Sequence, residues 1–305
     1  MTKLADTSKP KNPLIGVGWM IITGILFVGV TALVKLAGTR IPAAESAFLR
    51  YVLGLIFLVP MIPAIRRSGG LNGLGSIFAF RGIVHTIAVT LWFYAMARIP
   101  IADVTAMNYL SPVYVTLGAA LFLGETLAMR RLVAVLGALF GAMIILRPGF
   151  REVSDGHIAM LATAVFMASS YLTAKYLSGK TSAIMVVVML SITTSIGLAP
   201  LAWAVWVPPT QEEVVILFAV SALATAGHYT MTLAFTAAPV SVTQPVAFLQ
   251  LIWAVSIGVL FFGEPIDPFV VIGGLIIVGS ISYMSWREAV HKRKEITPHA
   301  TAPKT

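Results

Sequence analysis

The sequence predicts an all-α polytopic membrane protein with ten transmembrane helices in two inverted five-helix repeats. The chain is 58% hydrophobic and only 11% charged over 305 residues, whereas a soluble domain carries roughly 25% charged residues. Its apolar residues lie in blocks of about 20, the length at which a helix crosses a hydrocarbon core of about 30 Å. One phrase occurs twice, as LFLGE at Leu121–Glu125 and as LFFGE at Leu260–Glu264.

Ten apolar blocks, separated by short links that contain Pro, Gly, Lys and Arg, are the predicted spans. Polar tails flank them at residues 1–13 and 287–305, and the first tail has no apolar stretch of the kind found in a removable signal peptide. In chain order the spans are Leu14–Leu36, Ala43–Ile65, Leu74–Ala97, Ile101–Leu123, Met129–Leu146, Gly156–Leu177, Ser182–Val205, Glu213–Thr236, Val240–Phe262 and Pro268–Trp286.

The basic residues predict the orientation of these spans. Ten is an even number, so both tails lie on the same side of the membrane. If that side is the cytoplasm, fourteen of the 21 Lys and Arg residues fall in inner segments and five in outer segments. Lys and Arg are retained on the cytoplasmic side, so we expect both termini to be cytoplasmic.

The repeated phrase measures an internal repeat. A shift of 139 residues places Leu121 on Leu260, and it also places Pro100 on Pro239. The predicted repeats are residues 14–147 and 156–286, with five spans each. Because five is odd, the second repeat enters the membrane from the opposite side. Inverted repeats are common in secondary transporters, which bind their substrate near the midplane and expose it to each side in turn.

Several phrases in order resemble the ten-helix EamA-type branch of the drug/metabolite transporter superfamily. They are AFLRYVLGLIFLVP at Ala47–Pro60, FYAMARIPIADVTAMNYLSPVYVTLGAALFLGETL at Phe93–Leu127, GAMIILRPG at Gly141–Gly149 and AFTAAPVSVTQPVAFLQLIWAVSIGVLFFGE at Ala234–Glu264. The resemblance covers essentially all ten spans. It implies a carrier of small organic molecules in the bacterial inner membrane.

One further phrase, KLAGTRIPAAESAFLRY at Lys35–Tyr51, resembles bacterial carriers that take up riboflavin or S-adenosylmethionine. Riboflavin uptake is the leading substrate hypothesis, because a planar substrate with polar edges suits aromatic walls. The alternatives are S-adenosylmethionine or another amino-acid derivative, and export of a metabolite or drug, since a fold does not determine the direction of transport.

Ionisable side chains in the spans are candidate functional groups, because a charge in the bilayer costs about 2.5–3.5 kcal/mol. For gating or coupling we consider Glu45, Arg81, Glu125, His228 and Glu264. Glu125 and Glu264 end the repeated phrase at opposite faces, where each could cap the following helix or bond across the bundle. The alternative for Arg81 is snorkelling to the surface or contact with a lipid phosphate. The alternative for His228 is a neutral imidazole bonded to a neighbouring helix.

Polar and aromatic side chains of the spans are predicted to line a central cavity, because small-molecule sites combine apolar walls with a few hydrogen-bonding groups. Ser111 and Tyr114 occupy the positions in the first repeat that Gln250 and Trp253 occupy in the second. Packing is the alternative role for the aromatic residues, and an interhelical hydrogen bond is the alternative for Gln250. The candidate substrate-binding residues are Arg50, His85, Trp92, Asn108, Tyr109, Ser111, Tyr114, Gln244, Gln250 and Trp253.

The composition also argues against other classes of protein. There is no cysteine, so disulfides, Cys metal sites and Cys nucleophiles are excluded. The links are short and poor in acidic residues, which disfavours an integral-membrane lipid enzyme, and we predict no catalytic residue, metal or cofactor. The net charge of +9 is interpreted as loop charge rather than as a nucleic-acid surface. The predicted partners are the lipid bilayer and a small-molecule substrate, and a homodimer is an open alternative.

Overall fold

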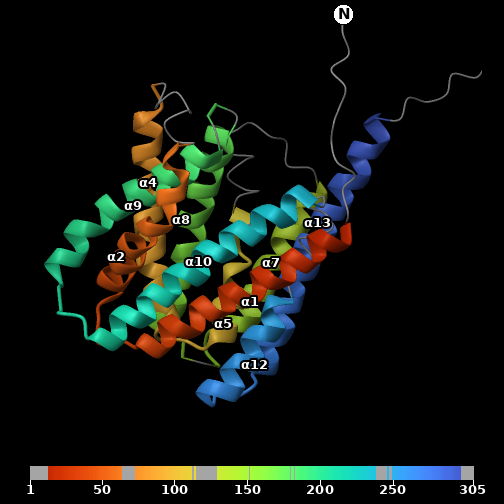
Figure 1. Ribbon diagram of the computed structural model, residues 1–305. Helices are drawn as coiled ribbons and strands as arrows, with labels where there is room; N and C mark the ends of the chain where they lie inside the picture. The colour runs from red at the N-terminus through yellow and green to blue at the C-terminus, as the bar shows by residue number, and fades with distance from the viewer. Residues whose placement is uncertain are drawn as a thin grey trace, which may run out of the picture.

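The computed structural model describes residues 13–63, 73–111, 113–114, 129–150, 152–178, 180–181, 183–237, 246 and 249–296, and these form a bundle of helices without a β-strand (Figure 1). The 3-10 helix η1 (Leu55–Met61) continues α2. The α-helices in this part of the chain are α1 (Pro13–Ala37), α2 (Ala43–Gly54), α4 (Gly75–Met96), α5 (Ile101–Asn108), α7 (Met129–Leu146), α8 (Asp155–Ser178), α9 (Ala183–Ala204), α10 (Gln211–Ala237), α12 (Gln250–Phe262) and α13 (Pro268–Ile296).

The predicted all-α membrane class is confirmed, and every predicted span overlaps at least one of these helices, although the bounds differ, most of all at α13, which ends at Ile296 rather than at Trp286. Six helical segments of the described chain are long and apolar enough to cross a membrane. They are Leu14–Ala37, Ala43–Pro60, Gly75–Met96, Asp155–Ala174, Met185–Ala204 and Gln211–Met231. The apolar parts of α5, α7, α12 and α13 are shorter in the described residues, so the number ten stays a prediction. Much of the predicted fourth span, and the start of the ninth, lie outside those residues.

Local sequence signals explain where several helices begin and end. Pro13 and Pro268 are the first residues of α1 and α13, where the missing proline N–H needs no partner. Thr210, just before α10, and Glu213, in its first turn, form a capping box. The side chain of each accepts a hydrogen bond from the backbone N–H of the other. Gly263, at φ 62°, ends α12 in the left-handed conformation that glycine adopts without strain.

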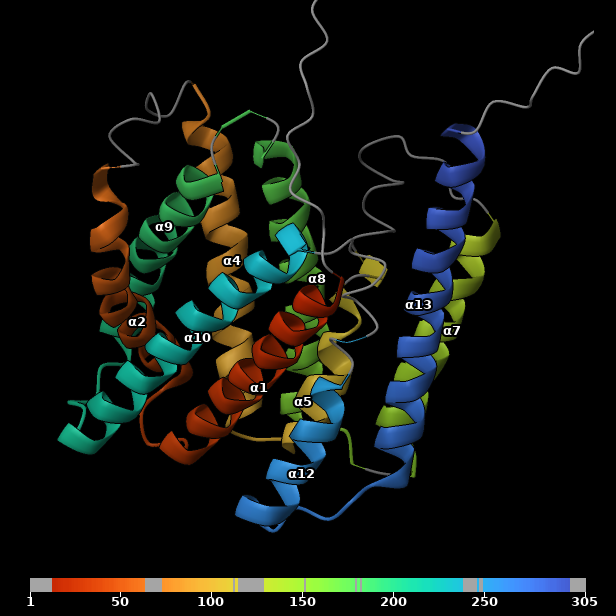
Figure 2. The same cartoon turned by 45° about the vertical axis from the view of Figure 1, so that its right-hand side comes forward.

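The helices pack in pairs that follow a pattern (Figure 2). Helix α1 packs along α10, and α4 packs along α8. Helix α4 also contacts α9, as α2 contacts α10.

The helix pairs follow the internal repeat. If the second half is superimposed on the first, α1, α2, α4, α5 and α7 correspond to α8, α9, α10, α12 and α13. The pair α1–α10 then maps onto α8–α4, and the pair α4–α9 maps onto α10–α2. The pairs α2–α9, α5–α12 and α7–α13 map onto themselves. For α2–α4 and α5–α13, the described residues show no equally extensive pair at the position that the repeat would generate.

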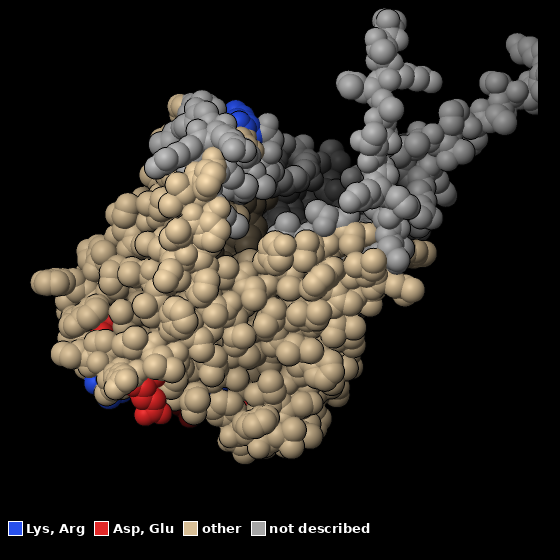
Figure 3. All heavy atoms as spheres, viewed as in Figure 1, with Lys and Arg blue, Asp and Glu red and all other residues tan. Residues whose placement is uncertain are grey.

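The surface and the interior are both apolar. Phe93, Met96, Met107 and Leu110 are completely buried where α4 meets α5 and the residues that follow it, while many large apolar side chains are exposed around the bundle. On the face in Figure 3, the charged side chains of the described residues lie near the lower left edge and at the upper end, and the broad area between them carries none. This distribution suits a bundle surrounded by lipid, because lipid accepts exposed apolar side chains and excludes charged ones.

Glycines allow the backbones of α7 and α13 to touch. A Cβ atom added to Gly141 would lie 2.6 Å from the carbonyl oxygen of Gly273, and one added to Gly273 would lie 2.5 Å from the carbonyl oxygen of Gly141. Such small residues at a helix crossing are typical of membrane bundles. Gly137 belongs to the same crossing, since a Cβ atom added there would collide with the hydroxyl oxygen of Ser280 on α13.

Replacing Gly141 by alanine is expected to lower stability, because the new methyl group meets backbone that cannot rotate away. Overpacking of this kind typically costs about 1–3 kcal/mol. The free energy of unfolding in detergent micelles measures the loss. The matched control is Gly279→Ala on α13, where an added Cβ has nothing within 4 Å; equal effects of the two substitutions would contradict the close crossing.

Candidate functional site

One end of the bundle, opposite the end that contains the first residues of α1 and the last residues of α13, brings several links together (Figure 2). The links are residues 38–42, 97–100, 147–150 with 152–154, 205–210 and 263–267. We call this end the distal end. Its importance lies in the charged side chains that connect the two halves of the chain there.

The Lys35–Glu264 pair is the first of these connections. The Nζ atom of Lys35 lies 2.6 Å from Oε1 of Glu264 and donates to the carbonyl oxygen of Ile99 at 2.9 Å. Oε2 of Glu264 accepts a hydrogen bond of 3.0 Å from the N–H of Ile101, the first residue of α5, where the helix dipole favours a negative charge. Glu264 thus bonds across the bundle, which was one of its two predicted possibilities, and does not cap the helix that follows it.

A second connection joins the link after α1 to the start of α10. Arg40 pairs with Glu213 and also donates to the carbonyl oxygen of Pro208. The hydrogen bond that the Arg40 guanidinium donates to the carboxylate of Glu213 raises the pKa of Arg40 above its ordinary value. Close by, the buried carboxylate of Glu45 accepts a 2.8 Å hydrogen bond from the N–H of Val207. Glu45 therefore connects the two halves through a buried carboxylate.

Two further pairs complete the distal end. Asp103 of α5 lies 2.9 Å from Nε2 of His157 on α8, both side chains being almost fully buried, and Nδ1 of His157 lies 2.8 Å from Oγ of Ser154. Arg147 pairs with Asp267 and stacks on the ring of Phe269. Each ion pair described here joins a residue of the first half to a residue of the second, so separating the halves at this end would require breaking all of them.

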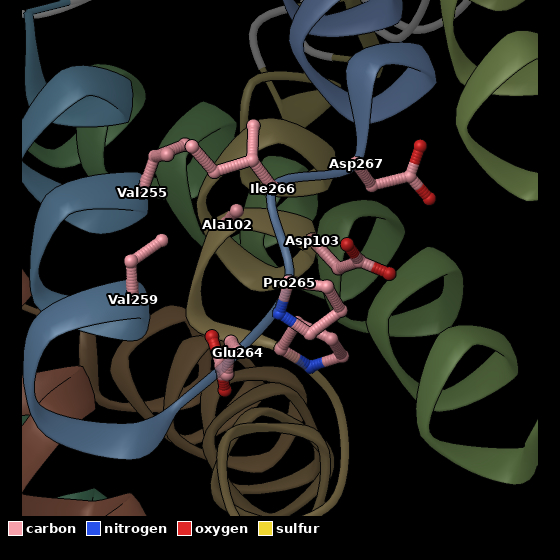
Figure 4. Close-up of a pocket in the computed structure, with 9 residues that line it drawn as sticks. Ala102, Asp103, Val255, Val259, Glu264, Pro265, Ile266 and Asp267 are labelled. Atoms are coloured by element: carbon pink, nitrogen blue, oxygen red, sulfur yellow. The ribbon is translucent and has the colours of Figure 1, made fainter.

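A small cavity lies beside these pairs, between α5 and α12 (Figure 4). Its volume is about 160 Å³, which is below the roughly 300–1,000 Å³ of sites for drug-sized ligands. It is therefore too small to be the substrate site in this conformation. It is lined by Pro100, Ala102, Asp103, Val255, Val259, Glu264, Pro265, Ile266 and Asp267.

Four basic side chains from α2, α4 and α10 lie within the bundle. Arg81 and His85 are four residues apart on α4. Tyr51, which contacts His85, is the neighbour of Arg50, and the charges of both arginines act on His85 and His228. Nε2 of His85 lies 2.8 Å from the hydroxyl of Tyr51 and Nδ1 lies 3.1 Å from Oγ of Ser170. We call this group the basic cluster: Arg50, Arg81, His85 and His228.

The arginines of the basic cluster have few partners. Arg81 is only 6% exposed, so its side chain lies within the bundle and does not snorkel to the surface. It donates one hydrogen bond of 2.9 Å to the carbonyl oxygen of Val186, and its buried Nε has no partner. Arg50 lies over the ring of Tyr51 at 4.1 Å. Neither arginine forms an ion pair with a carboxylate of the described residues, although buried charges are normally paired.

Two of the predicted aromatic residues lie in different parts of the core. Trp92 packs against the core cluster that contains Tyr51 and Tyr109, whereas Trp253 of α12 packs against Val28, Ile101 and Ala254. Gln250 and Trp253 lie beside Gly24 of α1. The buried indole N–H groups of Trp92 and Trp253 have no hydrogen-bond partner among the described residues.

The remaining candidates follow α5 or lie outside the described residues. Tyr109 and Ser111 are buried after the end of α5, and Asn108 and Tyr114 are half-buried. Gln244 and Glu125 lie outside the described residues, so their roles stay predictions. The cavity function of the whole set also stays a prediction.

Sequence reasoning missed most partners in these networks. Lys35, Arg40 and Arg147 are among the five basic residues assigned to outer segments and were not predicted to form ion pairs, and His157 was not singled out. The Thr210–Glu213 spacing was a usable signal, because it matches a capping box. The other pairs join residues more than 50 positions apart, and nothing in the local sequence indicates which charges meet.

Comparison with known families agrees with the division of the chain into two halves. The profile of the EamA-like transporter family matches the chain twice, over residues 14–147 and 154–286. A solved crystal structure of another protein is similar to this chain, with a TM-score of 0.58 and 16% sequence identity. The similarity covers 93% of this chain and 98% of the other. That likeness concerns the fold.

Curated relatives carry several transport functions. The pseudopaline exporter CntI of Pseudomonas aeruginosa is 27% identical over 86% of this chain and 93% of its own. The riboflavin transporter of Vibrio cholerae is 30% identical over 93% of this chain and 97% of its own. The S-adenosylmethionine uptake transporter of Rickettsia bellii is 23% identical over 94% of this chain and 98% of its own.

Glu264→Gln is expected to lower the free energy of unfolding by about 1.5–3 kcal/mol, because it leaves the Lys35 ammonium partly buried without its counter-ion. Denaturant titration in detergent micelles measures the loss, and Lys35→Gln should cost little more in the Glu264→Gln background. Glu212→Gln, at an exposed neighbour of Glu213, is the control and should change stability by less than about 0.5 kcal/mol. Additive losses in the double variant would show that the pair does not contribute.

Proposed function

Because this chain belongs to the EamA-like transporter family, we propose that it is a secondary carrier that moves a small organic metabolite across the bacterial inner membrane by alternating access. Its relatives are transporters, and we propose a carrier rather than an enzyme for this chain too. The observation that carries the mechanism is the distal end, where ion pairs join the two halves.

The proposed architecture is ten spans in two inverted repeats, at residues 14–147 and 156–286, with both termini in the cytoplasm. Two observations support it. The family profile matches each half separately, and most helix pairs between the halves have a mate that the repeat would generate. In this orientation the distal end faces away from the cytoplasm.

Alternating access then assigns a role to the distal ion pairs. Lys35–Glu264, Arg40–Glu213 and Arg147–Asp267 hold the outer ends of the halves together, and they would act as an outer gate. Opening to the outside requires their separation, and closing restores them. Glu45 belongs to this gate through its bond to the N–H of Val207.

For the substrate, riboflavin uptake is the leading hypothesis. The aromatic side chains Trp92, Tyr114 and Trp253 supply flat apolar surface, and the buried indole N–H groups without partners are available donors. Riboflavin transporters are among the relatives. Uptake of S-adenosylmethionine and export of a metabolite are the alternatives, since relatives with these functions match over a similar length.

Cells that express the chain are expected to accumulate labelled riboflavin in a saturable manner. Trp253→Ala should lower uptake about tenfold, as expected for loss of a large aromatic contact. The matched control is Trp203→Ala, at a side chain that is 83% exposed on α9, which should leave uptake unchanged. Uptake of another member of a labelled vitamin and metabolite panel would replace riboflavin, and extrusion without uptake would contradict import.

The gate is testable because the chain has no native cysteine. In Arg40→Cys/Glu213→Cys, a short reducible bis-methanethiosulfonate cross-linker is expected to stop transport in proteoliposomes, because the halves can no longer separate at the distal end. A reducing agent should restore transport, and each single variant should be insensitive to the reagent. Undiminished transport by the cross-linked protein would contradict the role of this pair in gating.

A further inference from the structure

The basic cluster has no acidic counterpart near it. Carboxylates of the described residues lie at or near the distal end or in the final turns of α13. The carboxylates of Glu264, Glu213, Asp267 and Asp103 are paired with Lys35, Arg40, Arg147 and His157, respectively. Arg50 and Arg81 therefore carry positive charge within a membrane bundle without a counter-charge from the described part of the chain.

The donors of the cluster exceed the acceptors around them. A guanidinium carries five N–H donors, yet Arg81 donates to one carbonyl oxygen and keeps a buried Nε without a partner. The side chain is 94% buried, since only 6% is exposed. A buried donor without an acceptor is costly, and a ligand that supplies acceptor oxygens would remove that cost.

The four members of the cluster differ in burial. Arg50 is half-buried and His228 is exposed, whereas Arg81 and His85 are buried. His85 is held by Tyr51 and Ser170, and His228 meets the ring of Phe27 edge-on. The arrangement therefore combines two buried groups with two that are more exposed.

We propose that the basic cluster binds an anionic oxygen group, a carboxylate or a phosphate, of the transported molecule. The proposal rests on the carrier function and names the class of its substrate. Arginine is suited to this role because its planar fork matches the oxygens of both groups. The anion would pair with Arg81 and Arg50, and its oxygens would accept hydrogen bonds from the N–H groups of Arg81 that have no partner among the described residues.

The charge of the cluster separates the substrate hypotheses. Uncharged riboflavin would leave the arginines without a counter-charge, whereas its 5′-phosphate would satisfy them. A sulfonium cation such as S-adenosylmethionine would bring a further positive charge into the site, so its carboxylate alone would have to provide the attraction. If the cluster binds the transported molecule, an anionic form such as riboflavin 5′-phosphate is therefore favoured over the uncharged vitamin, which leads the substrate hypotheses above on other grounds.

The test uses matched probes that differ in charge. The purified full-length protein in detergent is heated with riboflavin or riboflavin 5′-phosphate, with succinamide or succinate, and with phosphatidylglycerol. At least one soluble anion is expected to raise the unfolding temperature by about 3 °C or more beyond its uncharged partner. Arg81→Gln and Arg50→Gln should abolish that difference, while Arg81→Lys keeps part of it. Arg98→Gln, at an exposed arginine stacked on Tyr94, is the control.

The outcomes distinguish this proposal from the carrier function. No preference for a soluble anion, or a preference unchanged in both glutamine variants, overturns the anion site. Stabilisation by phosphatidylglycerol alone, lost in Arg81→Gln, overturns it in favour of a lipid headgroup. Arg50→Gln provides the test if Arg81→Gln does not fold. Anion-dependent stabilisation without transport of any panel member in proteoliposomes would count against the carrier and retain the site.

Discussion

A charge within a lipid bilayer must find its partner inside the protein, and this constraint organises the whole structure. With so few charged residues in the chain, each pairing has a large influence on which helices meet. The pairs at the distal end all reach from one half of the chain to the other. The bundle is therefore held by apolar packing along its length and by electrostatic attraction at one end.

The charges fall into two populations with opposite properties. At the distal end, cations and carboxylates neutralise each other and give a face that is closed without a ligand. In the basic cluster, Tyr51 and Ser170 hold His85, and the carbonyl oxygen of Val186 accepts a hydrogen bond from Arg81, so none of these partners supplies a negative charge. The charges of the distal end are thus paired, and the arginines of the basic cluster have no counter-charge among the described residues. This difference is compatible with a protein that changes conformation when its ligand binds.

The class, the helix positions and the family could be predicted from sequence because apolar block length and repeated phrases are local signals. For Glu264 the sequence left open a cap on the following helix or a bond across the bundle, and the structure shows the second; the position at a span end could be predicted because the glycine before it is a local signal. Its partner Lys35 could not be predicted, since the two residues are far apart in sequence and meet only through packing of α1 against α12. The same limit applies to His85 and Ser170: residue type suggests a polar contact, but only the tertiary arrangement selects the partner.

The carboxylate of Glu264 binds an ammonium group from α1 and the first amide of α5 at the same time. Three helices consequently share one anchor, and a partial opening would strand both the ammonium group and the amide. If the distal end is the proposed gate, this shared anchor favours opening in a single concerted step over gradual loosening. Because the pair is mostly shielded from solvent, dissolved salt should have little effect on it.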